Sequence, residues 1–226
     1  MNKRIITATL LMAMTSLAGF AQRQFDNLDR GLIAVKSNGG MYCSWRINAD
    51  EYYATTYDLY RDGVKVNDQP LTVSNFTDPN GTLESQYTVK AVHAGQASAD
   101  SKKGYNLANG WLEVKKPKRI SNDGKTDISN QYEPNDATIG DVDGDGEMEL
   151  ITKQLFIGQD PNNTSQADFA RIEVQKLDGT LLWWIDCGPN MWDFQQNEIN
   201  IMAYDWDGDG KAECVARLQD GSVVHM

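Results

Sequence analysis

Apolar and polar side chains alternate in a series of short runs through the first half of the chain, and turn-forming residues separate the runs. The runs are residues 31–37, 41–47, 56–66 and 85–95. A period of two is typical of strands with one buried face. Asp62-Gly63, between strand-forming residues, predicts a two-residue hairpin turn. The sequence therefore predicts an all-β fold that begins with an antiparallel β-sandwich over residues 22–108.

The last run of this predicted sandwich carries a further pattern. Tyr87, Val89 and Ala91 alternate up to the sequence HAG, and they follow an NFTD turn. The pattern resembles the later strands of a fibronectin type III-like module.

Residues 109–135 differ in composition from the segments on either side. The stretch 115–136 reads KKPKRISNDGKTDISNQYEPND, which is polar and rich in turn formers. Pro117 and Pro134 argue against regular structure in its interior. We interpret residues 109–135 as a linker that leads into a second domain, residues 136–226. No segment after residue 21 predicts a helix.

The second domain contains an internal repeat. NDATIGDVDGDGEMELITKQ aligns with INIMAYDWDGDGKAECVARL at an offset of 64 residues. ARIEVQKLDGTLLWWID lies between the copies and supplies two more strands around Asp178-Gly179. About four strands per repeat are typical of a β-propeller. Residues 136–226 are therefore interpreted as its first blades, with the remainder of the ring missing.

Each copy of the repeat contains an aspartate-rich loop that predicts a calcium site. Carboxylates at positions 1, 3 and 5 of a tight loop point to a common centre, and glycine at position 6 permits the sharp turn. An EF-hand loop closes with glutamate at position 12, but Thr152 and Ala216 stand there. A glutamate at position 9 closes each loop instead, and the position-7 carbonyls are further candidates. The predicted ligands are Asp141, Asp143, Asp145, Glu147 and Glu149, and Asp205, Asp207, Asp209, Lys211 and Glu213.

The alternative for these loops is a pair of Asp/Gly turns that hold no ion. Three carboxylates within five residues repel one another unless a cation lies among them. Two copies with the same closing glutamate favour the cation. Mg²⁺ fits less well, because it prefers fewer carboxylates and more water.

Charge and the N-terminus restrict the functions that the chain can have. Lys3 and Arg4 precede an apolar run and Gly19-Phe20-Ala21, a pattern typical of a signal peptide over residues 1–21. We therefore expect a protein that is secreted, periplasmic or on the cell surface, without a transmembrane segment. The net charge is −11, or −13 without Lys3 and Arg4, which disfavours nucleic acid as a partner.

The order of these features resembles the N-terminal part of the family 11 polysaccharide lyases that act on rhamnogalacturonan. The resemblance lies in RGLIAVKSNGGMYCSWRI, NDATIGDVDGDGEMELI, KLDGTLLWWIDCG and YDWDGDGKAEC, and it extends over nearly all of the chain after residue 21. It implies an eight-bladed propeller behind a small sandwich, with calcium in blade loops and near the substrate. It also implies cleavage of the rhamnogalacturonan part of pectin, between rhamnose and galacturonic acid, by β-elimination.

The chain departs from the family pattern at two places. It ends at Met226 after two loops, and two blades cannot close a ring, so we expect residues 22–226 alone to be inactive. The segment WDFQQNEINIMAYD lacks the His-Tyr pair typical of the family. No catalytic residue is therefore predicted, and the oligomeric state stays open.

Aromatic side chains are candidates for contact with sugar rings. Trp192 and Phe194 lie in an irregular segment and are predicted to bind substrate. Trp183 and Trp184 alternate along a strand and are predicted to pack between blades. The alternative function is a non-catalytic carbohydrate-binding or adhesion module built on an FG-GAP-type calcium propeller, because such proteins share the aspartate-rich loops.

Overall fold

The computed structural model describes residues 28–226, except 50, 52–53, 159–166 and 192–199. The described chain is all-β, and its one helical element there is the 3₁₀ turn η2 (Ser129–Gln131). Trp192 and Phe194 lie outside the described residues, as does the predicted signal peptide.

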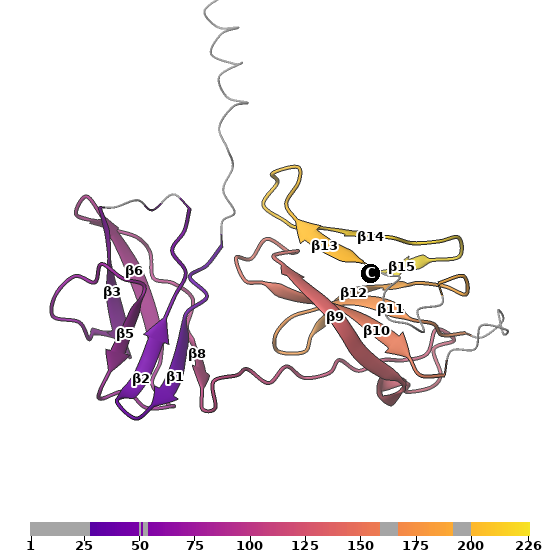
Figure 1. Ribbon diagram of the computed structural model, residues 1–226, viewed down its shortest axis with the longest axis horizontal. Coiled ribbons are helices and arrows are strands. Elements are labelled where there is room, and N and C mark those ends of the chain that lie inside the picture. The colour runs from indigo at the N-terminus through magenta and orange to yellow at the C-terminus, as the bar shows by residue number, and fades with distance from the viewer. Residues whose placement is uncertain (1–27, 50, 52–53, 159–166, 192–199) are drawn as a thin grey trace, which may run out of the picture.

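The N-terminal part consists of two sheets packed face to face (Figure 1). Its strands are β1 (Ile33–Ser37), β2 (Gly40–Ser44), β3 (Thr55–Arg61), β4 (Val64–Lys65), β5 (Asn75–Asp78), β6 (Tyr87–His93), β7 (Gln96–Ala97) and β8 (Tyr105–Leu107). The strand orders are β5-β2-β1-β8 and β4-β3-β6-β7. Alternate residues such as Ala34, Cys43, Leu59 and Val89 fill the space between the sheets and are fully buried. We call this part the N-terminal module.

The hairpin predicted at Asp62-Gly63 is confirmed. Arg61 pairs with Val64, so the loop between β3 and β4 has two residues. Both loop residues have positive φ, 51° for Asp62 and 80° for Gly63. Positive φ at both positions matches the right-handed twist of the flanking strands.

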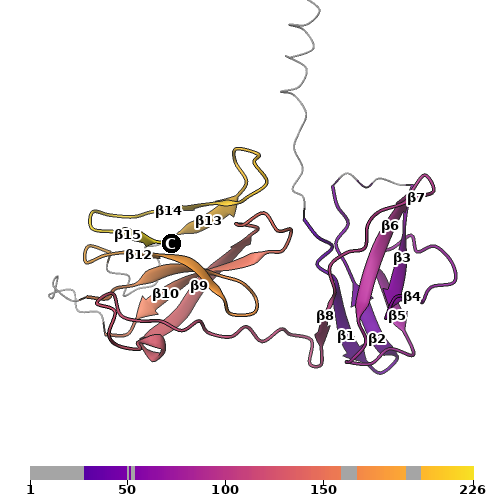
Figure 2. The same ribbon diagram turned by 180° about the vertical axis from the view of Figure 1, so that it is seen from behind.

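The C-terminal part is built on a five-stranded antiparallel sheet. Its strands are β9 (Tyr132–Gly140), β10 (Glu149–Phe156), β11 (Arg171–Gln175), β12 (Leu181–Asp186) and β15 (Val223–His225), in the order β15-β12-β11-β10-β9. The hairpin of β13 (Ile201–Tyr204) and β14 (Glu213–Ala216) stacks on this sheet (Figures 1 and 2). Ala203 and Cys214 of the hairpin pack against a core formed by Ile151, Ile172 and Val174.

Pro134 lies inside a strand, although its presence argued against regular structure there. β9 begins at Tyr132, within the predicted linker, and runs through Pro134. β9 is the edge strand of its sheet, and the register shifts between Thr152 and Gln154, opposite Pro134. Edge strands and irregular pairings tolerate a residue that has no backbone N–H.

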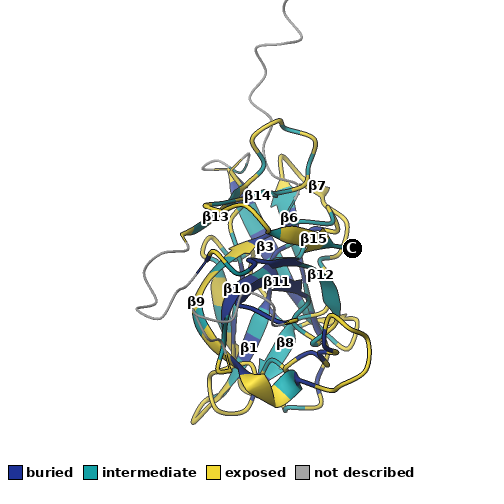
Figure 3. Cartoon of the chain, turned by 90° about the vertical axis from the view of Figure 1, so that its right-hand side faces the viewer, coloured by how far each residue is buried: buried dark blue, intermediate teal, exposed yellow. Residues whose placement is uncertain are grey.

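β11 is buried on both faces. Ile172 and Val174 face the core, while Arg171, Glu173 and Gln175 alternate with them and are also buried. Figure 3 shows this strand among the dark, buried elements in the middle of the molecule. The segment that precedes β9 covers the polar face, where the Arg119 guanidinium donates two 2.7 Å hydrogen bonds to Glu173. The segment predicted as a linker therefore packs on the sheet through a buried ion pair.

Candidate functional site

The two aspartate-rich loops have the same backbone structure. In the β9–β10 loop, Asp141 accepts hydrogen bonds from the amides of Gly144 at 2.8 Å, Asp145 at 3.0 Å and Gly146 at 2.8 Å. In the β13–β14 loop, Asp205 accepts from the three equivalent amides at 2.7, 3.1 and 2.9 Å. The glycines at positions 4 and 6 of each loop have φ between 77° and 91°, where residues with a Cβ are strained. The repeat seen in the sequence is thus a repeat in structure.

The glutamate at position 9 closes each loop from the start of the following strand. Glu149 accepts a 2.9 Å hydrogen bond from the amide of Val142, and Glu213 accepts one of the same length from Trp206. Burial raises the pKa of Glu149. In both loops the closing carboxylate is held beside the aspartate at position 1.

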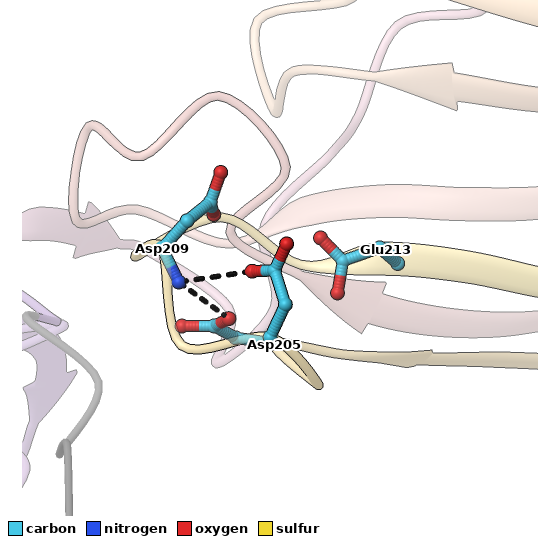
Figure 4. Close-up of side chains that lie close together, drawn as sticks. Asp205, Asp209 and Glu213 are labelled. Carbon is cyan, nitrogen blue, oxygen red and sulfur yellow. Dashed lines mark hydrogen bonds between the residues drawn. The ribbon is translucent and has the colours of Figure 1, made fainter. Parts of the chain in front are cut away.

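Carboxylate oxygens converge in both loops. Ligand atoms of Asp141, Asp143 and Glu149 lie within 4.8 Å of one another, and so do those of Asp205, Asp207, Asp209 and Glu213. Figure 4 shows Asp205, Asp209 and Glu213 around the second loop. Asp145 does not belong to the converging group of the first loop. Glu147 and Lys211 were predicted to contribute only their backbone carbonyls. Their amides donate to Asp145 and Asp209 at 2.8 and 2.9 Å.

Two lysines from outside the first loop contact its carboxylates, and the sequence of the loop did not predict these contacts. The Lys176 ammonium lies 2.6 Å from Asp143, 2.8 Å from Asp145 and 3.8 Å from Glu149. Lys102 of the N-terminal module lies 3.1 Å from Asp145 and 3.6 Å from Glu147. The hydrogen bond from Lys176 lowers the pKa of Asp145, and its bonds to Asp143 and Asp145 raise the pKa of Lys176. The first loop therefore surrounds a cationic group.

The chemistry of these loops suits a hard divalent cation. The side chains that converge offer only oxygen atoms, as Ca²⁺ and Mg²⁺ require. The Lys176 ammonium touches the carboxylates that would hold an ion, so a positive charge is accommodated in the first loop. The side chains whose oxygens converge as such an ion requires are Asp141, Asp143 and Glu149 in the first loop, and Asp205, Asp207, Asp209 and Glu213 in the second.

The aromatic and basic side chains of the C-terminal part that could meet a sugar chain divide into packed and exposed residues. Trp183 packs against the core of the sheet, and Trp184 stacks on His225 at 4.7 Å. Trp206 and Tyr204, beside the second loop, are about half exposed. Arg171 is buried and bonds to Asp168 at 2.8 Å and Asn122 at 2.9 Å, so it is not available to a substrate carboxylate.

The cysteines offer no reactive thiolate. Cys43 and Cys187 are fully buried, and Cys214 is partly buried. Burial raises the pKa of Cys43 to about 12, which keeps it protonated at neutral pH.

Comparison with known proteins identifies two matching segments. Residues 23–106 match the β-sheet domain of rhamnogalacturonan I lyases, and residues 111–225 match the C-terminal domain of rhamnogalacturonan lyase family 11. Among the residues that the structure describes, no helix is long and apolar enough to cross a membrane.

Individual relatives and a solved structure agree with these matches. The chain is 39% identical to the rhamnogalacturonan endolyase YesW of Bacillus subtilis strain 168, over 98% of the chain and 37% of YesW. It is 40% identical to the exolyase YesX of the same strain, over 89% of the chain and 33% of YesX. The structure of a Bacillus licheniformis rhamnogalacturonan lyase aligns with a TM-score of 0.71 and 34% identity, over 88% of the chain and 34% of that protein. The chain spans about a third of the length of the proteins it matches.

Proposed function

The chain belongs to the family 11 rhamnogalacturonan lyases, and on that basis we propose that the protein cleaves the rhamnogalacturonan backbone of pectin by β-elimination, with calcium bound in its aspartate-rich loops. The observation that carries this proposal is the pair of matches that together extend from residue 23 to residue 225. The identities of 39% and 40% to an endolyase and an exolyase support the same substrate class. They do not favour a non-catalytic adhesion module.

The finer architecture is part of the proposal. The strand sets β5-β2-β1 and β4-β3-β6-β7 support a fibronectin type III-like module. The meander β9-β10-β11-β12 supports one propeller blade, and the β13–β14 hairpin with its equivalent loop supports the start of a second. β15 pairs with β12, and within the described residues β13 and β14 form a sheet of two strands.

In this proposal, calcium in the two loops fixes the turns between consecutive strands. Asp141 and Asp205 already organise the loop amides, and the position-9 glutamates tie each loop to the next strand. When bound, a calcium ion supplies the positive charge that such converging carboxylates need. Tyr204 precedes the second loop and Trp206 lies in it; both are about half exposed, and they are our candidates for contact with sugar rings.

The substrate proposal is tested with rhamnogalacturonan I and the full-length protein. We expect a time-dependent rise in the ultraviolet absorbance of unsaturated uronate, because β-elimination leaves a double bond on the new chain end. Homogalacturonan serves as the control substrate and is expected to give none. The size of the first products separates internal from terminal cleavage. Absence of unsaturated product from rhamnogalacturonan at several calcium concentrations would contradict the proposal.

We also propose that the protein is exported. The support is the N-terminal pattern of Lys3-Arg4, an apolar run and Gly19-Phe20-Ala21. N-terminal sequencing of the protein from its native host is expected to begin near Gln22. Recovery of the unprocessed N-terminus from the cytoplasm would contradict export.

A further inference from the structure

The first aspartate-rich loop is a junction between three parts of the chain. Its Gly146 carbonyl accepts a 2.8 Å hydrogen bond from the amide of Asp29, in the N-terminal module. Its Asp141 carbonyl accepts a 2.7 Å bond from the amide of Ala212, in the second loop. Lys176, directly after β11, reaches its carboxylates from a third direction. The loop is therefore held in place by elements outside its own hairpin.

The charges around the two loops differ. The carboxylates of the first loop are paired with Lys176 and Lys102, whose side chains are 29% and 39% exposed. In the described part of the chain, no lysine or arginine forms an ion pair with Asp205, Asp207, Asp209 or Glu213. The two loops share their aspartates and closing glutamate, but position 7 is Glu147 in the first loop and Lys211 in the second. The contact between Lys102 and Glu147 therefore has no counterpart at the second loop, whereas the contacts of Lys176 come from tertiary structure.

A divalent cation and the lysines compete for the same oxygen atoms. Lys176 lies 2.6 Å from Asp143 and 2.8 Å from Asp145, so its ammonium must move before a cation binds both side chains. Lys102 stays attached to the module and places a further positive charge 3.1 Å from Asp145. The affinity of an oxygen site for calcium depends on the net charge of its ligands, and a nearby like charge opposes the ion at this range.

We propose that Lys176 and Lys102 lower the calcium affinity of the first loop, so that the two loops fill at different calcium concentrations. This inference rests on calcium binding, which is part of the proposed function. It adds that affinity at the first loop is set from outside the loop, by β11 and by the N-terminal module. The second loop fills first, and the first loop exchanges its lysine contacts for calcium only at a higher concentration.

The test is calorimetric titration of calcium into folded, calcium-free full-length protein with one loop disabled at a time. Asp207→Ala disables the second loop, so only the first can bind calcium. Asp143→Ala disables the first loop, so only the second can. In the Asp207→Ala background, Lys176→Met is expected to tighten calcium binding about tenfold, and Lys102→Met by a smaller factor because its ammonium lies farther from the ligands. In the Asp143→Ala background, Lys176→Met is expected to leave the affinity unchanged.

The matched control is Lys65→Met, which removes an equally exposed lysine that pairs with Asp58 at 2.7 Å in the N-terminal module. It is expected to change neither affinity. If Lys176→Met does not fold, Lys176→Gln and Lys102→Met make the same test. If neither Lys176→Met nor Lys102→Met changes the calcium affinity of the first loop by more than about twofold, the inference is overturned, although calcium binding itself stands. No calcium heat from either loop, with or without the lysines, overturns the inference together with the calcium part of the proposed function.

Discussion

Removal of calcium is expected to lower the melting temperature of the C-terminal part of the chain by roughly 20–40 °C. A ligand that binds only the native state stabilises it by about 2.7 kcal/mol at a concentration of one hundred times its Kd. Two loops together then contribute about 5 kcal/mol, and each kcal/mol shifts the melting temperature of a domain this small by about 4–8 °C. Without the ion, the converging carboxylates of the second loop repel one another, and those of the first loop are offset only in part by Lys176 and Lys102. The measurement is a calorimetric melting curve with calcium and with chelator.

Variants separate this effect from a general effect of chelator. Asp143→Ala and Asp207→Ala each remove one carboxylate from a converging group and are expected to lower the melting temperature with calcium present. The double variant is expected to lose most of its response to chelator. Asp68→Ala, at an exposed position of the N-terminal module, is the control and is expected to respond as the parent does. Identical melting curves with and without chelator, and no calcium by elemental analysis, would contradict calcium binding.

Local patterns in the sequence were sufficient for the features that local interactions determine. Asp62-Gly63 adopts the positive φ angles that its hairpin requires, and the two aspartate-rich loops share one hydrogen-bond pattern because they share one spacing. The lysines at the first loop could not be predicted. Lys176 lies 27 residues after Glu149, and Lys102 lies 43 residues before Asp145. Only the packing of the sheet and of the N-terminal module brings these lysines to the first loop. Pairing of β15 with β12 depends likewise on which strand edge is free in three dimensions.

The segment 109–135 shows a second limit of sequence patterns. Its polar, turn-rich composition predicted a linker, yet Arg119 and Glu173 are fully buried against each other. A buried charge pair leaves no apolar signal in the sequence, because each member is hydrophilic and its partner is distant. Tyr132 also contacts Arg119: the guanidinium carbon of Arg119 lies 5.4 Å from the centre of the Tyr132 ring. Arg119 therefore attaches this segment to β11.

Arg119→Met is expected to lower the free energy of unfolding of the C-terminal part by about 3–5 kcal/mol, because it leaves the Glu173 carboxylate buried without its counter-charge. Both side chains have no exposed surface, and the pair makes two hydrogen bonds of 2.7 Å. Urea unfolding of calcium-loaded protein measures the change, so that ion binding is held constant. Lys118→Met is the control, since it removes one positive charge from an exposed neighbour on the same segment.

The double variant Arg119→Met/Glu173→Leu distinguishes loss of a partner from loss of attachment. Replacement of both charges by apolar side chains removes the desolvation cost of the carboxylate, so most of the lost stability is expected to return. If the segment packed only loosely on β11, Glu173 would regain water when Arg119 is removed, and the single variant would lose less than about 1 kcal/mol, as an exposed pair does. That result would contradict the firm attachment of this segment to β11 through Arg119, and amide hydrogen exchange at β11 would then show early opening of the covered face.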